Sequence, residues 1–211
     1  MSLLLIVTAP LWYLFIISLY PVPSRGWRGL LLPFLGGLVL GMAALSVTLS
    51  LLTRTPFGVE LGRLYWWAWF RGPGWSTTVA VILTAVLFLP KPTSFSRIRE
   101  ITGWLAGMTT TYLVWHAFRP TPGFDDYRVF FMPFVWMLSM GSAAWLTDRG
   151  LRFDGIPRYL LLISAFLFPS ILTFLPVLYT SGEIPAAWLI VLPLVGVSAF
   201  LSYLDSRGRL G

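Results

Sequence analysis

The sequence predicts an all-α, polytopic integral membrane protein with about seven transmembrane helices. Hydrophobic residues make up 57% of its 211 residues and charged residues only 11%, a balance outside the range of soluble domains. The mean hydropathy of +0.79 agrees with this. Charged residues fall at the ends of long apolar runs or between them. We therefore expect one membrane domain over residues 1–211.

Seven apolar runs follow one another along the chain, each long enough to cross a bilayer. The hydrocarbon core is about 30 Å thick and needs about 20 residues of apolar helix. The predicted spans cover residues 2–20, 29–53, 75–90, 101–118, 129–147, 159–180 and 186–204. The first run lacks the basic start and the cleavage site of a signal peptide, so we interpret it as a retained span. A six-span alternative treats the short third run as re-entrant.

The charge on the two sides of these spans predicts an orientation. With seven spans, one side receives ten Arg or Lys against four carboxylates, a net charge of +6. The other side receives five against four, a net charge of +1. Because cytoplasmic loops carry the excess of Lys and Arg, we expect the N-terminus outside and the C-terminus inside. The expected location is a prokaryotic plasma (inner) membrane, crossed in multiple passes and in contact with its lipids.

Small residues and prolines mark two features within the spans. Gly37 and Gly41 in the second span, and Gly103 and Gly107 in the fourth, follow the small-xxx-small pattern that lets helices approach closely. Prolines inside the sixth span, at positions 169 and 176, are expected to bend it. Such bends occur both as hinges and as static kinks.

The second connection, residues 54–74, predicts a helix that lies in the outer membrane interface. At helical spacing Glu60, Arg63 and Trp67 share one face, and apolar residues share another. We take these three as candidate binding residues. Two interpretations stay open: an aromatic anchor with no other role, or a lid or lateral gate over a cavity that opens outward.

The other candidate residues lie in and before the connection at 116–128. His116 is the only histidine, and it is followed within 13 residues by two Arg and two adjacent Asp. The candidate binding residues of this region are Thr110, Thr111, His116, Arg119, Asp125, Asp126 and Arg128. The carboxylates and His could act on a lipid headgroup while the Arg residues clamp its phosphate. Alternatively, the segment is a turn with a helix cap and headgroup contacts, and the Thr hydroxyls bond to the preceding helical turn.

Several classes of function are disfavoured by what the sequence lacks. There is no Cys, which excludes thiolate catalysis and Cys-ligated metals. A single His beside two Asp has no recognised ligand spacing, so we expect no metal, no other cofactor and no assigned catalytic residue. The basic residues are not clustered as nucleic-acid binding requires. Spans without ionisable groups also disfavour coupling through a mid-membrane carboxylate.

Three hypotheses for function remain. The first is a membrane transport protein, or the membrane subunit of a transporter, for a neutral, weakly polar or amphipathic small-molecule solute. The second is a non-catalytic scaffold or assembly subunit that docks a membrane or cytoplasmic protein, with Arg97, Arg99, Arg149 and Arg152 as contact points. The third is an enzyme that acts on a lipid or lipid-linked headgroup at the outer face.

Overall fold

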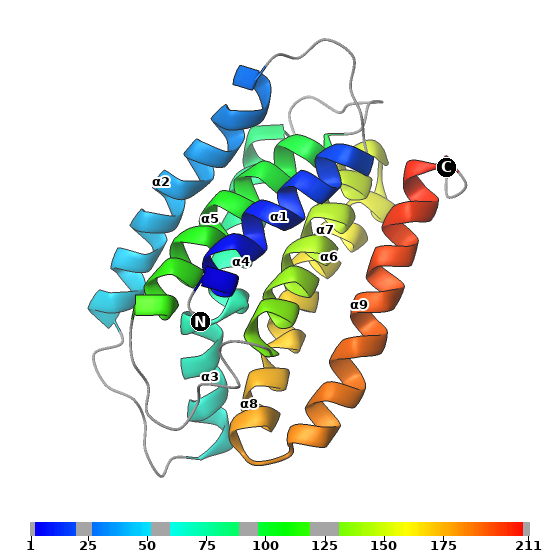
Figure 1. Ribbon diagram of the computed structural model, residues 1–211. Helices are drawn as coiled ribbons and strands as arrows, with labels where there is room; N and C mark the ends of the chain where they lie inside the picture. Colours follow the sequence, from blue (N-terminus) through cyan, green and yellow to red (C-terminus); the bar gives the residue numbers. More distant parts are fainter. Residues whose placement is uncertain (1–2, 20–26, 52–59, 89–96, 119–130, 209–211) are drawn as a thin grey trace.

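The computed structural model describes residues 3–19, 27–51, 60–88, 97–118 and 131–208, which form helices and no strand. The helices are α1 (Leu3–Leu19), α2 (Trp27–Leu51), α3 (Leu61–Arg71), α4 (Pro73–Phe88), α5 (Ile98–Phe118), α6 (Met132–Arg152), α7 (Ile156–Leu172), α8 (Phe174–Thr180) and α9 (Ile184–Ser206). The long helices run up and down in one bundle, with α9 along one edge and α3 and α8 at one end (Figure 1). The all-α prediction is confirmed for these residues.

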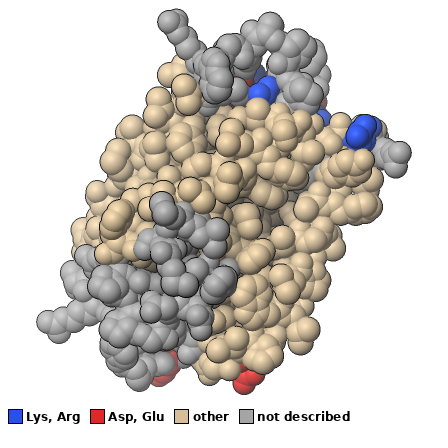
Figure 2. Space-filling model, in the orientation of Figure 1, with Lys and Arg blue, Asp and Glu red and all other residues tan. Residues whose placement is uncertain are grey.

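The described chain contains helices that can cross a membrane. Three segments are both long and apolar enough: Leu31–Ser50, Ile156–Tyr179 and Ile184–Ser206. Large apolar side chains also cover the outside of the bundle; Leu32 is 65% exposed and Leu189 76% exposed. Figure 2 shows this face as apolar between a few basic residues at one end and a few acidic residues at the other. These features fit an integral membrane protein.

The two ends of the bundle differ in their polar residues. We call the end that holds Arg149, Arg152, Arg158 and Arg207 the basic end; α6 and α9 finish there, and α5 and α7 begin there. The opposite end holds α3, α8 and the start of α9, with Glu183 immediately before α9.

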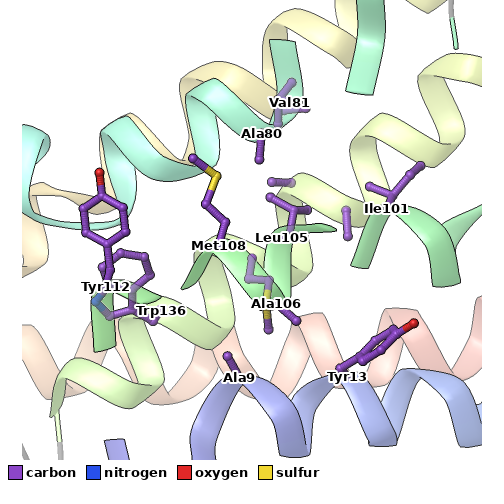
Figure 3. Packing of buried hydrophobic residues seen from close by; sticks show 14 of the residues in the cluster. Ala9, Tyr13, Ala80, Val81, Ile101, Leu105, Ala106, Met108, Tyr112 and Trp136 are labelled. Carbon is purple, nitrogen blue, oxygen red and sulfur yellow. The ribbon is translucent and has the colours of Figure 1, made fainter. Parts of the chain in front are cut away.

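Helix α5 forms the centre of the main core. Its residues Leu105, Ala106 and Met108 are at most 1% exposed. They lie between α4, which contributes Ala80, and α1, which contributes Ala9, as Figure 3 shows. The core is therefore formed by helices that are far apart in the sequence, and α5 is shielded from the surroundings over most of its length.

The contact between α2 and α5 confirms the prediction from the glycine spacing. A Cβ at Gly37 would lie 3.1 Å from the Cα of Gly107 and against the carbonyl of Trp104. A Cβ at Gly41 would lie 3.0 Å from the Cα of Met108. The two backbones approach so closely that only glycine fits at these positions without a shift.

The predicted run 159–180 is two helices rather than one. Helix α7 ends at Leu172 and α8 begins at Phe174. Pro169 and Pro176 have no N–H to donate to the preceding turn, which weakens the helix on both sides of Thr173. The Thr173 N–H bonds to the Ser170 carbonyl at 3.2 Å, and the Thr173 hydroxyl donates to the Pro169 carbonyl at 3.1 Å. The expected bend is thus a break centred on Thr173.

The predicted end of the fifth run, at residue 147, is too early. Helix α6 continues to Arg152, so Asp148, Arg149 and Arg152 lie in its last turns. Sequence patterning assigned these charged residues to a connection because they are polar. Ion pairs to Asp148 and Asp205 accommodate them at the helix end.

Candidate functional site

An apolar groove lies between α6, α7 and α9. Its volume is about 310 Å³. The residues that line it are Leu138, Ser142, Trp145 and Leu146 of α6, Ser164 and Phe168 of α7, and Leu194, Val197, Ser198 and Leu201 of α9. It extends over nine residues of α6 (138–146) and eight residues of α9 (194–201), which is about 12 Å of helix. A cavity of this size is within the range of small-molecule sites.

The groove follows α9 between two attachments of this helix to the rest of the bundle. Near the start of α9, Ala187 and Val191 are fully buried in a second apolar cluster with Leu138 of α6 and Leu175 of α8. Near its end, Asp205 forms an ion pair with Arg149 of α6. The groove residues of α9, 194–201, lie between these two attachments.

Two of the three serines in the groove use their hydroxyls within their own helices. The Ser142 hydroxyl donates to the Leu138 carbonyl at 2.8 Å, and the Ser164 hydroxyl donates to the Leu160 carbonyl at 2.8 Å. A hydroxyl bonded in this way has no proton left to donate to a polar solute. The walls of the groove therefore favour hydrocarbon.

At the basic end, polar residues join three helices. The carboxylate of Asp148, which is 2% exposed, accepts a hydrogen bond from the backbone N–H of Arg97 at 2.6 Å and pairs with Arg152. Arg97 immediately precedes α5, so a side chain of α6 acts as the N-cap of α5. Arg149 pairs with Asp205 and thereby joins α6 to α9.

At the opposite end, α3 is attached to the break between α7 and α8. The Tyr65 hydroxyl donates to the Ser170 carbonyl at 2.9 Å, and the Trp69 indole N–H donates to the Ser170 hydroxyl at 2.9 Å. The rings of Tyr65 and Phe174 are 4.6 Å apart. Burial raises the pKa of the Tyr65 phenol above its ordinary value, so the hydroxyl keeps the proton that it donates at neutral pH.

Two of the candidate binding residues meet around Arg71, the last residue of α3. The Arg71 guanidinium lies 4.8 Å from the Trp67 ring centroid and 5.7 Å from that of Trp115. The His116 Nε2 is 2.9 Å from the Arg71 carbonyl. Because a carbonyl only accepts, this nitrogen carries the proton. The cluster fastens the end of α5 to the end of α3.

The other candidate binding residues within the described chain are not part of this cluster. Glu60 and Arg63 are exposed at the start of α3. The Thr110 hydroxyl donates to the Ala106 carbonyl at 2.7 Å, and the Thr111 hydroxyl donates to the Leu38 carbonyl of α2 at 3.2 Å. Arg119, Asp125, Asp126 and Arg128 lie outside the described residues.

The contact points of the scaffold hypothesis are largely occupied within the chain. Arg149 and Arg152 pair with Asp205 and Asp148, and Arg97 lies 3.6 Å from Glu100. Each would have to leave a carboxylate to reach a partner protein. The Arg149–Asp205 pair joins α6 to α9, whereas the other two pairs are local to the end of α6 and the start of α5.

Sequence reasoning missed the groove, Ser170 and the role of Arg71. The groove residues are ordinary apolar and small residues of spans, with no motif to distinguish them. Arg71 closes the aromatic run 65–70, which was the one signal available for its stacking.

Comparison of the chain with models of protein families, with curated proteins and with solved structures finds no match. Among the residues that the structure describes, no group of three or more His, Asp or Glu could hold a metal ion. The groove and the two ends of the bundle are therefore the features that bear on function.

Proposed function

We propose that the chain is an integral membrane protein that takes an amphipathic solute from the bilayer into the groove between α6, α7 and α9. It acts in transport of that solute, alone or as the membrane subunit of a larger carrier. In this proposal the membrane is a prokaryotic plasma membrane, crossed seven times, with the N-terminus outside and the C-terminus inside.

The observation that carries the proposal is the apolar lining of the groove and its position at the outside of the bundle. Beside it, Leu167 of α7 is 46% exposed and Val197 of α9 is 54% exposed. A molecule that reaches the groove between these residues comes from the hydrocarbon phase. Because the Ser142 and Ser164 hydroxyls are bonded to their own helices, the part of the solute in the groove is hydrocarbon.

One observation supports seven spans over the six-span alternative, and a second supports the orientation. Helix α4 lies alongside α5, α6 and α7 and does not turn back after its first turns (Figure 1). The ends of α6 and α9 bring Arg149, Arg152 and Arg207 to the same end of the bundle. An excess of Arg at one end is what the positive-inside rule expects of the cytoplasmic side.

The test is to fill the groove and measure binding of an uncharged lipid. Ser164→Phe places a ring in the groove, whereas Ser46→Phe places the same ring on α2. Both serines are exposed and donate to carbonyls of their own helices, Leu160 and Met42 respectively, so the pair is matched. The probe is pyrene-labelled diacylglycerol, titrated into the detergent-purified protein and then followed between the leaflets of proteoliposomes.

We expect Ser164→Phe to weaken binding of the probe about five- to hundredfold, because overfilling a site costs about 1–3 kcal/mol. The Ser46→Phe variant should bind and move the probe as the native protein does. If the native protein binds no probe, or if the two variants bind it equally well, the groove is not the solute site and the proposal is wrong.

A further inference from the structure

The groove has a polar end, where α6 and α9 reach the basic end of the bundle. Trp145 lines the groove, and Arg149 follows it one helical turn later on α6. On α9, Leu201 lines the groove and Asp205 follows it one helical turn later. Arg149 and Asp205 form an ion pair, and the Arg149 guanidinium lies 5.7 Å from the centroid of the Trp145 ring. The apolar groove therefore leads to a largely buried ion pair.

Two of the N–H donors at this end that have no acceptor among the described residues belong to the groove and its ion pair. They are the Trp145 Nε1 and the Arg149 Nε, and both atoms are buried. The ion pair engages only the Nη2 of Arg149, whose side chain is 11% exposed. The nearby Ser142 hydroxyl donates to carbonyls of its own helix and makes no hydrogen bond with the Trp145 indole N–H. Buried donors without acceptors are unfavourable and rare in folded proteins.

We propose that this end of the groove binds the phosphate of a membrane phospholipid whose acyl chain occupies the groove. Phosphate oxygens accept from Trp145 and from the Nε–H of Arg149, and Arg is the cation best suited to phosphate. The inference rests on the proposed function, since it names the class of solute that the groove takes. It also assigns Trp145 and Arg149 as the residues that select the head of the solute.

The surrounding charges favour a phosphate that is carried by a lipid. Asp205 neutralises Arg149 when the groove is empty, so the pair is stable without a ligand. Arg207, which is exposed two residues after Asp205, adds positive charge at the mouth. A phosphate that is joined to an acyl chain is brought to these donors by the apolar groove, which its chain occupies. The occupant is therefore a phospholipid of the leaflet at the basic end.

The test compares two lipids with identical acyl chains, pyrene-labelled phosphatidylglycerol and pyrene-labelled diacylglycerol. The native protein should prefer the phospholipid by about tenfold, since hydrogen bonds to a charged group are strong. Trp145→Phe keeps an aromatic side chain but removes the indole N–H. Arg149→Lys keeps the positive charge but removes the guanidinium Nε–H. In each variant the preference, taken as the ratio of the two affinities, should fall toward one, whatever the change in diacylglycerol affinity itself. Trp75→Phe is the matched control, because its indole N–H is also buried without an acceptor among the described residues, but at the opposite end.

The outcomes separate this inference from the proposed function. If the native protein binds both lipids equally, or if Trp145→Phe and Arg149→Lys both keep the full preference, the phosphate site is refuted. The groove then remains the site of an acyl chain, provided that Ser164→Phe still blocks diacylglycerol. If the native protein binds diacylglycerol and Ser164→Phe does not weaken that binding, the proposed function itself is wrong.

Discussion

Replacing Asp148 by alanine removes two interactions from the basic end of the bundle at once. One carboxylate oxygen accepts the Arg97 N–H at 2.6 Å, and the other pairs with Arg152. The first bond caps α5 from a neighbouring helix, and the second lies within α6. Because α5 is the centre of the core, we expect the stability of the whole bundle to depend on this side chain.

The magnitude follows from burial. Loss of a helix N-cap costs about 1 kcal/mol, with a range of about 0.5–2. Removing one partner of a fully buried ion pair costs about 3–5 kcal/mol. Here the Asp148 side chain is 2% exposed but that of Arg152 is 25% exposed, so water screens the cation that remains. We reduce the ion-pair contribution to about 1–2 kcal/mol for this reason. Asp148→Ala should therefore destabilise the protein by about 2–4 kcal/mol.

The assay is the free energy of unfolding in mixed micelles, titrated with a denaturing detergent. Asp148→Asn keeps an oxygen for the Arg97 N–H and removes the charge, so it should recover about 1 kcal/mol relative to alanine. Asp154→Ala is the control, because its carboxylate pairs with Arg158 at the same spacing but is 84% exposed. That variant should change stability by less than about 0.5 kcal/mol.

Two results would refute the reasoning about Asp148. If Asp148→Ala and Asp148→Asn lower the free energy of unfolding equally, the hydrogen bond to the Arg97 N–H does not contribute to stability. If Asp148→Ala costs no more than Asp154→Ala, the pairing at the basic end does not stabilise the fold. A double-mutant cycle of Asp148→Ala with Arg152→Ala separates the two contributions. The ion pair should appear as a coupling energy between the two substitutions, whereas the hydrogen bond from the Arg97 N–H should not.

Two further predictions concern helix contacts away from the groove. Gly107→Ala would place a Cβ 2.8 Å from the Leu38 backbone nitrogen, so it should destabilise the α2–α5 contact by about 1–3 kcal/mol in the same assay. Gly196→Ala, whose Cβ meets nothing within 4 Å, should be neutral or stabilising; equal effects would contradict the packing argument. Tyr65→Phe removes the hydrogen bond to the Ser170 carbonyl and should cost about 1 kcal/mol at pH 8. Because burial raises the pKa of the folded Tyr65 above 10.0, this difference should be full below pH 10 and shrink at higher pH; a difference independent of pH up to pH 12 would contradict this assignment.

Much of the fold follows from local features of the sequence. The apolar runs predict the positions of the long helices because a span must be apolar over its whole length. The glycine spacing predicts a close-packing face on α2 and another on α5, and the structure shows that these two faces pack against each other. The ends of helices are less predictable. Asp148 and Arg149 extend α6 only because residues on α5 and α9 receive them, and no local pattern contains that information.

The groove could not be predicted for a related reason. Its shape depends on how far α9 stands from α7, which is set by Val191 at one end and Asp205 at the other. The lining residues are the same kinds that fill any span. The sequence predicted Trp67 and His116 as candidates from their rarity and position, and both lie in one cluster around Arg71. Their use there is a contact between helices, which the residue types alone did not indicate.

The groove and helix α3 share one element, helix α7, and this links the two ends of the bundle. Phe168 lines the groove, and Ser170, two residues later, receives hydrogen bonds from Tyr65 and Trp69 of α3. The break at Thr173 lets this part of α7 move without α8, since the regular helical hydrogen bonds are interrupted there. The position of α3 therefore restrains the wall of the groove that Phe168 forms. On this argument the lid and anchor interpretations of α3 are compatible: α3 anchors α7 while it stays bound to Ser170, and we expect its release to widen the groove at the end away from Arg149.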